Sequence, residues 1–163
     1  WAAALRSAAD SLGLKSALWA EPGRAIVASA AVTIYTVGGI KEIPGTRTYV
    51  SVDGGMSDNP RPIIYGSGYE TFLPRSVSAD RRKLIRLVGK HCESGDVLVQ
   101  DGWVTADLRV NDLLATPVTG AYGHSMGSNY NKMPRPPVVF VRNGDARLVV
   151  RREVSEDLIR NDV

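Results

Sequence analysis

The sequence is poor in metal-binding and disulfide-forming side chains, with one cysteine, Cys92, and two histidines among 163 residues. A single cysteine excludes an internal disulfide, and with two histidines it gives no zinc spacing, so we expect no metal and a reducing, cytoplasmic compartment. The chain also has no apolar run near the ~18 residues that span a membrane. Its apolar start is interrupted by Arg6, Asp10 and Lys15, unlike a signal peptide, so we expect no membrane partner.

An excess of charge of one sign is also missing. Twenty Lys and Arg against 17 Asp and Glu give a net charge of +3, and the basic residues are scattered except at 81–83 and 151–152. We therefore expect no nucleic-acid partner. The 44% of hydrophobic residues suffices for one sizeable core. The chain lacks an initiator methionine and opens on Trp1 within a helical pattern, which predicts a piece of a longer protein.

The first 30 residues have the order of an α/β unit. The spacing of Trp1, Leu5 and Leu12 predicts an amphipathic helix over 1–13, closed by Gly13. A short apolar strand is expected over 14–24, ending in the turn Glu21-Pro22-Gly23-Arg24, and a short helix of small residues follows. One such unit cannot close a core by itself, so residues 1–30 are interpreted as a remnant of a larger architecture.

From residue 31 the apolar residues alternate, as in strands. Strand patterns flank the turns Pro44-Gly45 and Gly144-Asp145 and recur between them, one of them running over 86–92 to Cys92, which predicts an antiparallel β domain over 31–163. The last ten residues predict a short helix, with Ser155 as its cap and Val154, Leu158 and Ile159 on one face.

Three segments carry candidate binding residues. Gly23 and Arg24 in the EPGR turn could cradle a phosphate or carboxylate, although from the residues alone a Pro-Gly turn with a solvated arginine is the better explanation. Arg61 and Tyr65 would share a face if their segment is helical, and a polar loop is the alternative. Tyr122, between Gly120 and Gly123, could contact a flat ligand or be a packed tyrosine.

The only thiol lies beside a carboxylate in the turn KHCESGD. A neighbouring carboxylate does not lower the pKa of a thiol, so Cys92 with Glu93 suits proton donation better than thiolate attack. A buried cysteine at a strand end with a solvated glutamate remains the alternative. His91 and His124 could each be an acid or a base, but a structural or surface histidine is the better interpretation of both, so they are assigned no role.

In this order, EPGR, YVSVDGGMSDNPRP, YG, GKHCESGD and TGAYGHSMGSNYN resemble the C-terminal part of the diaminopimelate decarboxylase family, whose members act with pyridoxal 5'-phosphate and have the alanine-racemase fold. The resemblance covers essentially the whole chain. It implies a mainly β fold, an antiparallel β-sandwich or barrel-like C-terminal domain, preceded by the last α/β unit of a TIM-type barrel. It also implies conversion of meso-diaminopimelate to L-lysine and carbon dioxide.

The resemblance implies a role for each candidate residue. Glu21, Gly23 and Arg24 would meet the cofactor phosphate, and Arg24 would also face the substrate carboxylate. Arg61 and Tyr65 would bind the distal end of the substrate, and Tyr122 would contact cofactor and substrate. Cys92, as proton donor, and Glu93, as ligand of the distal ammonium, would act across a homodimer interface.

The imine-forming lysine of the family lies in its barrel, and no lysine of this chain lies in a matching motif. We therefore expect the chain alone to be inactive and not to hold the cofactor. The alternatives are a related ornithine or arginine decarboxylase, a non-catalytic β-domain interaction module, and an unrelated ligand-binding β-barrel. Apolar side chains at Trp1, Leu5, Leu18 and Trp19 are expected to be exposed and to favour association.

Overall fold

The computed structural model describes residues 1–163 and is built from seven strands and five short helices. The helices are α1 (Ala2–Ser11), α2 (Arg24–Val27), α3 (Arg61–Tyr65), α4 (Gly123–Met126) and α5 (Ser155–Ile159). The strands are β1 (Val32–Ile43), β2 (Arg47–Val52), β3 (Lys83–Val88), β4 (Val97–Val104), β5 (Leu113–Pro117), β6 (Val138–Arg142) and β7 (Asp145–Val150). Single 3-10 turns lie at 28–30, 74–76 and 130–132.

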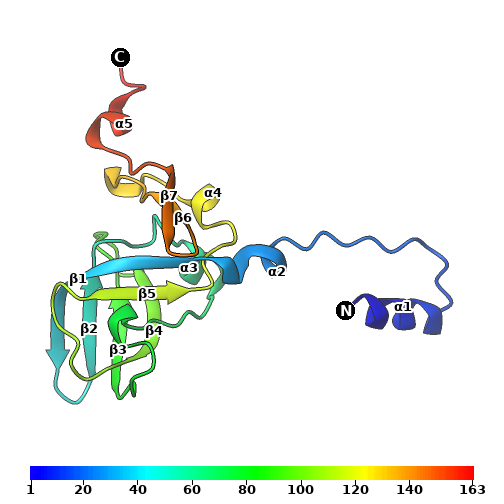
Figure 1. Cartoon of the computed structure of the whole chain (residues 1–163), viewed down its shortest axis with the longest axis horizontal. Helices are drawn as coiled ribbons and strands as arrows, with labels where there is room; N and C mark the ends of the chain where they lie inside the picture. The colour runs from blue at the N-terminus through cyan, green and yellow to red at the C-terminus, as the bar shows by residue number, and fades with distance from the viewer.

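Five strands form one curled sheet in the order β4-β3-β2-β1-β5, and β6 and β7 form a separate hairpin (Figure 1). The predicted mainly β fold is confirmed. The sheet is mixed rather than wholly antiparallel, because β2 and β3 run parallel. The long connection over 53–82 returns the chain to the end at which β2 begins, and a parallel neighbour requires such a crossover.

The core lies on one face of this sheet. Along β2 the residues alternate between half-buried and buried, so Thr48, Val50 and Val52 point inward. Val50 and Val52 join a hydrophobic cluster that includes fully buried Leu73, Leu87 and Leu114 from other parts of the domain. The period of two read from the sequence is therefore the period of burial.

The predicted elements of the first 30 residues are confirmed only in part. Both helices form, as α1 and α2, but residues 14–22 contain no strand. A strand needs a neighbour for its N–H and C=O groups, and none lies beside this segment, which runs extended between α1 and α2 (Figure 1). The predicted domain boundary at residue 30 stays a prediction.

Two predicted boundaries in the later part are wrong. The strand expected to run on to Cys92 ends at Val88, because the chain turns at Gly89 to meet the buried Asp96. The closing helix forms, but its N-cap is Val154 rather than Ser155. The carboxylate of Asp157 accepts the N–H of Val154 at 2.9 Å, which satisfies that donor from inside the first turn.

Large apolar side chains are exposed, as predicted, near the start of the chain. Trp1 is 71% exposed and Trp19 is 92% exposed, and α1 lies apart from the sheet (Figure 1). The hairpin of β6 and β7 also exposes apolar residues, with Val141 at 72% and Leu148 at 60%. None of the helices combines the length and apolarity that crossing a bilayer requires.

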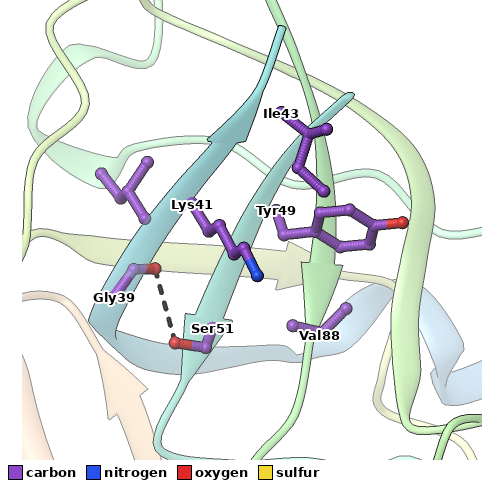
Figure 2. A pocket seen from close by; sticks show the side chains of 7 residues that line it. Gly39, Lys41, Ile43, Tyr49, Ser51 and Val88 are labelled. Atoms are coloured by element: carbon purple, nitrogen blue, oxygen red, sulfur yellow. Dashed lines mark hydrogen bonds between the residues drawn. The ribbon is translucent and has the colours of Figure 1, made fainter. Parts of the chain in front are cut away.

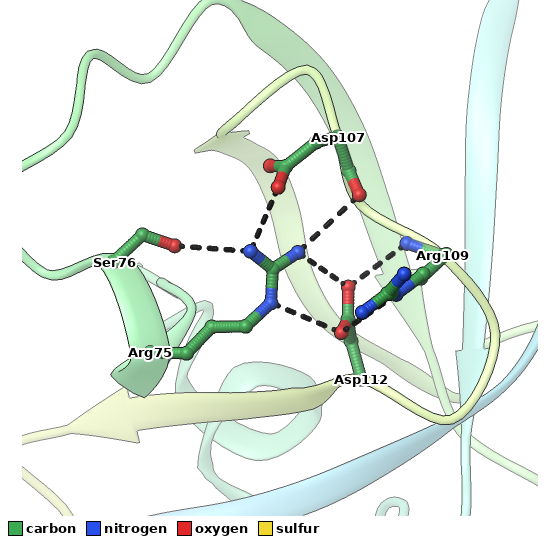
Figure 3. A network of polar contacts seen from close by, with 5 residues as sticks. All are labelled: Arg75, Ser76, Asp107, Arg109 and Asp112. Carbon is green, nitrogen blue, oxygen red and sulfur yellow. Dashed lines mark hydrogen bonds and ion pairs between the residues drawn. The ribbon is translucent and has the colours of Figure 1, made fainter.

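A forked ion pair joins the connection before β3 to the loop before β5 (Figure 3). Arg75 donates from Nε and Nη2 to both oxygens of Asp112, at 3.1 and 2.9 Å, and from Nη1 to Asp107 at 2.7 Å. Asp112 is buried, and its backbone carbonyl accepts the N–H of Val37 in β1 at 2.9 Å. The pair therefore fixes the path of two loops over the core.

The Arg75 network should weaken in acid. The guanidinium of Arg75 lowers the pKa of Asp107 from 3.8 to about 2, and it also lowers the pKa of Asp112. Both carboxylates are therefore more acidic when folded, so their contribution is complete above pH ~4 and is lost as the pH falls toward 2. Measured by urea unfolding, the free energy of unfolding should fall less between pH 6 and pH 3 for Arg75→Met than for the unchanged chain. If the free energy of unfolding fell equally in both proteins, Arg75 would not be the cause of the lowered pKa values.

Candidate functional site

The segment after β2, residues 53–60, connects three of the four places where candidate residues were predicted: the start of α3, the segment after α4 and the turn that carries the thiol. The backbone N–H of Gly55 donates to the Asp58 carboxylate at 3.0 Å, which closes a tight loop. The N–H of Ser128 donates to the carbonyl of Ser57 at 3.0 Å, which attaches the segment after α4. The N–H of Lys90 donates to the carbonyl of Gly54 at 3.0 Å, which attaches the turn that carries the thiol.

A buried carboxylate, Asp96, joins this loop to the thiol turn. It accepts the N–H of Met56 at 2.7 Å, the N–H of His91 at 2.8 Å and the Nδ1–H of His91 at 3.0 Å. Two glycines make room for it, because a Cβ on Gly55 would lie 2.7 Å from its Oδ2 and a Cβ on Gly89 would overlap it. The DGG and GKHCESGD motifs are thus two halves of one packed unit.

Arg61 and Tyr65 lie on one face of α3, as the helical interpretation of their spacing predicted. The guanidinium carbon of Arg61 is 4.7 Å from the centroid of the Tyr65 ring. The Nε of Arg61 is buried without a partner, whereas Tyr65 is 60% exposed. The pair presents a cation and a phenol, which together suit a carboxylate.

Gly23, Arg24 and Tyr122 meet, although they are almost a hundred positions apart in the sequence. The hydroxyl of Tyr122 fills the space where a Cβ on Gly23 would lie, and the Arg24 guanidinium is 5.4 Å from the centroid of the Tyr122 ring. Tyr122 has a positive φ of 66°, which is unfavourable for a tyrosine. Glu21 is exposed and makes no hydrogen bond or ion pair within the chain.

These residues fit an anionic group such as the phosphate of pyridoxal phosphate. The Nη2 of Arg24 is buried and has no hydrogen-bond partner in the chain, and the Tyr122 hydroxyl packs against the neighbouring Gly23 of the EPGR turn. The helix that follows, α2, has only four residues, so a helix dipole adds little to binding. Arg24 and Tyr122 are therefore the groups that could hold an anion here.

Cys92 and Glu93 are both exposed, on the turn between β3 and β4. The predicted alternative of a buried cysteine is wrong. The hydroxyl of Tyr130 donates to Oε1 of Glu93, so the glutamate is oriented rather than freely solvated. No hydrogen bond, ion pair or aromatic contact links Cys92 or Glu93 to Arg24, Arg61 or Tyr122.

Sequence reasoning missed Tyr130 and Asp96, whereas the structural interpretation of His91 is confirmed. His91 is 7% exposed, is hydrogen-bonded to Asp96, and stacks on the Tyr130 ring with centroids 5.8 Å apart and an interplanar angle of 10°. His124 is exposed. An aromatic residue within the polar run GSNYN was the available signal for Tyr130, but its partner lies 37 positions away.

A shallow groove of ≈610 Å³ lies elsewhere, over β1, β2 and β3 (Figure 2). Lys41, Tyr49 and Val88 are among its lining residues, and the hydroxyl of Ser51 donates to the carbonyl of Gly39 within it at 3.4 Å. None of the predicted site residues lines this groove. No cluster of three His, Cys, Asp or Glu side chains is placed to hold a metal.

Comparison with known families defines the class. The profile of the C-terminal sheet domain of the pyridoxal-dependent decarboxylases matches residues 24–120. The chain therefore belongs to this family of decarboxylases, as the sequence resemblance predicted.

Particular relatives are diaminopimelate decarboxylases. The enzyme of Actinosynnema pretiosum subsp. auranticum is 56% identical over 143 residues, which are 88% of this chain and 32% of the relative. That of Bacillus subtilis is 50% identical over 146 residues, 90% of this chain and 33% of the relative. The chain thus spans about a third of the length of the curated relatives it matches.

Solved structures agree on the fold. A diaminopimelate decarboxylase of M. jannaschii in complex with L-lysine superposes with a TM-score of 0.80 at 35% identity, over 88% of this chain and 32% of that one. A lysine/ornithine decarboxylase of Vibrio vulnificus superposes with a TM-score of 0.59 at 24% identity, over 71% of this chain and 30% of that one, which shows a shared fold only.

Because Gly89 packs against Asp96, one added methyl group at this position should destabilise the protein. Gly89→Ala should lower the free energy of unfolding by about 1–3 kcal/mol, because the new Cβ would overlap Oδ2 of Asp96. The matched control is Gly68→Ala, where a Cβ meets nothing within 4 Å, so the change should stay within about 0.5 kcal/mol. Urea unfolding of the two variants measures the difference, and equal stabilities would refute the packing argument.

Proposed function

We propose that this chain is the C-terminal, substrate-binding and dimer-forming part of a pyridoxal-phosphate-dependent diaminopimelate decarboxylase, which forms L-lysine and carbon dioxide from meso-diaminopimelate. The observation that carries the proposal is the exposed Cys92–Glu93 turn, held in place by the buried Asp96. A thiol and a carboxylate presented on a fixed backbone suit action on a ligand from outside this domain. The high identity to diaminopimelate decarboxylases supports the choice of substrate.

The charges of the candidate residues match both ends of this substrate. meso-Diaminopimelate carries two carboxylates and two ammonium groups. Arg24 and Arg61 each have a buried guanidinium nitrogen without a partner, and a carboxylate would satisfy it. Glu93 keeps Oε2 free for an ammonium group. Ornithine and arginine carry only one carboxylate each, so they would leave one arginine unpaired.

Each candidate residue has a different chemical role in the proposed reaction. Pyridoxal phosphate, when bound, supplies an electron sink for the bond that breaks on loss of carbon dioxide. Arg24 and Tyr122 bind the cofactor phosphate and the nearer substrate carboxylate beside the EPGR turn. Arg61 with Tyr65 binds the distal carboxylate. Glu93 orients the distal ammonium. The thiol of Cys92 donates its Sγ proton to the carbon that has lost its carboxylate.

Fusion to a relative's first two thirds tests the function. The N-terminal part of the Bacillus subtilis diaminopimelate decarboxylase, joined ahead of residue 24, should release carbon dioxide from meso-diaminopimelate when loaded with pyridoxal phosphate. Cys92→Ser should lower kcat about 10²-fold or more, because the general acid is lost. The chain alone should release none. Turnover of ornithine or arginine instead would favour the related decarboxylases.

Matched variants sharpen the assay. Glu93→Gln should raise KM for meso-diaminopimelate, because a neutral amide no longer attracts the distal ammonium. Glu70→Gln removes another exposed carboxylate, outside the proposed site, and should change neither kcat nor KM by more than about two-fold. A fusion that binds pyridoxal phosphate but never turns over would instead support a non-catalytic interaction module.

Complementation tests the homodimer. We propose that Cys92 and Glu93 act in the partner's site. A Cys92→Ala subunit therefore lacks the proton donor that it supplies to its partner, whereas an Arg24→Ala subunit lacks the arginine of its own site. Neither variant fusion should turn over by itself, but a co-expressed mixture should regain activity because one site in each mixed dimer is intact. No recovery in mixed dimers purified with two affinity tags would place all residues in one subunit.

A further inference from the structure

We propose that Tyr130 is a positioning residue that fixes the carboxylate of Glu93 for recognition of the substrate's distal ammonium. This inference rests on the proposed function, because the ammonium is part of the substrate proposed there. The Tyr130 hydroxyl donates to Oε1 of Glu93. Its bond selects one orientation of the carboxylate and leaves Oε2 for the ligand.

The ring of Tyr130 is held by a rigid platform. It stacks on the His91 ring, with centroids 5.8 Å apart and planes 10° from parallel. His91 is fixed in turn, because its Nδ1 and its backbone N–H both donate to Asp96, at 3.0 and 2.8 Å. His91 and Asp96 are buried, so this platform has little freedom to move.

The chain just before Tyr130 is attached to the rest of the domain at two residues. The preceding Ser128 donates its N–H to the carbonyl of Ser57 at 3.0 Å. Asn129 donates from Nδ2 to Glu153 at 2.5 Å. The hydroxyl therefore has a fixed position relative to the loop that also carries the thiol turn.

A fixed acceptor binds better than a mobile one. Glu93 is exposed, and without the Tyr130 bond its long side chain would sample several rotamers. Binding would then have to order that side chain, which weakens affinity by about 2- to 10-fold. The penalty applies to ligands that carry the distal ammonium and not to ligands that lack it.

Tyr130→Phe in the active fusion protein separates positioning from folding. KM for meso-diaminopimelate and the inhibition constant of L-lysine should both rise about 2- to 10-fold, with kcat within about two-fold. The inhibition constant of 2-aminopimelate, which has two carboxylates and one amine, should not change. Tyr49→Phe removes a hydroxyl in the groove over the sheet and should leave all of these values unchanged. Equal weakening of both inhibitors, or of neither, overturns the proposal.

A second measurement needs no activity and uses the 163-residue chain. The Glu93 carboxylate raises the pKa of Tyr130 above its ordinary value of 10.0, and the nearby Cys92 adds to the rise. In ¹³C-tyrosine NMR titrations, Glu93→Gln and His91→Ala should both lower this pKa, by removing the acceptor and the platform. An unchanged pKa in Glu93→Gln overturns the positioning proposal even if the fusion works. A fusion without turnover, with the pKa lowered as expected, refutes only the proposed function.

Discussion

The buried carboxylate of Asp96 is the constraint on which the rest of the site depends. It accepts three hydrogen bonds, two from His91 and one from Met56, and so ties the turn after β3 to the loop after β2. A buried charge is tolerated only when its hydrogen bonds are made, and Gly55 and Gly89 provide the space for it to make them. The conformation of both segments follows from this one requirement.

The buried hydrogen bonds of Asp96 also separate the residues that support the site from the residues that are exposed to a ligand. Two of the groups that we propose to act on a ligand, Cys92 and Glu93, are exposed, while the Asp96 side chain that fixes their turn is buried. Precision at a site comes from packing and hydrogen bonds behind the residues that touch the ligand. Tyr130 extends this support to the surface, since it links the buried His91 to the exposed Glu93.

The Arg24–Tyr122 contact shows another kind of support. Tyr122 adopts a left-handed backbone conformation and packs its hydroxyl against Gly23. Such a conformation costs of order 1–3 kcal/mol and persists only where the surroundings enforce it. The unpartnered nitrogens of Arg24 and Arg61 are a further cost in this chain, and an anionic ligand would remove it.

The sequence by itself determined the alternating strands, the hairpin turns, the family and the residue types of the site. These features are local, because burial in a strand has a period of two and turns depend on a few residues. It did not determine the parallel pairing of β2 with β3, the missing strand over 14–22, or the contact of Tyr130 with Glu93. Those depend on which segments meet in space, so only the tertiary structure decided them.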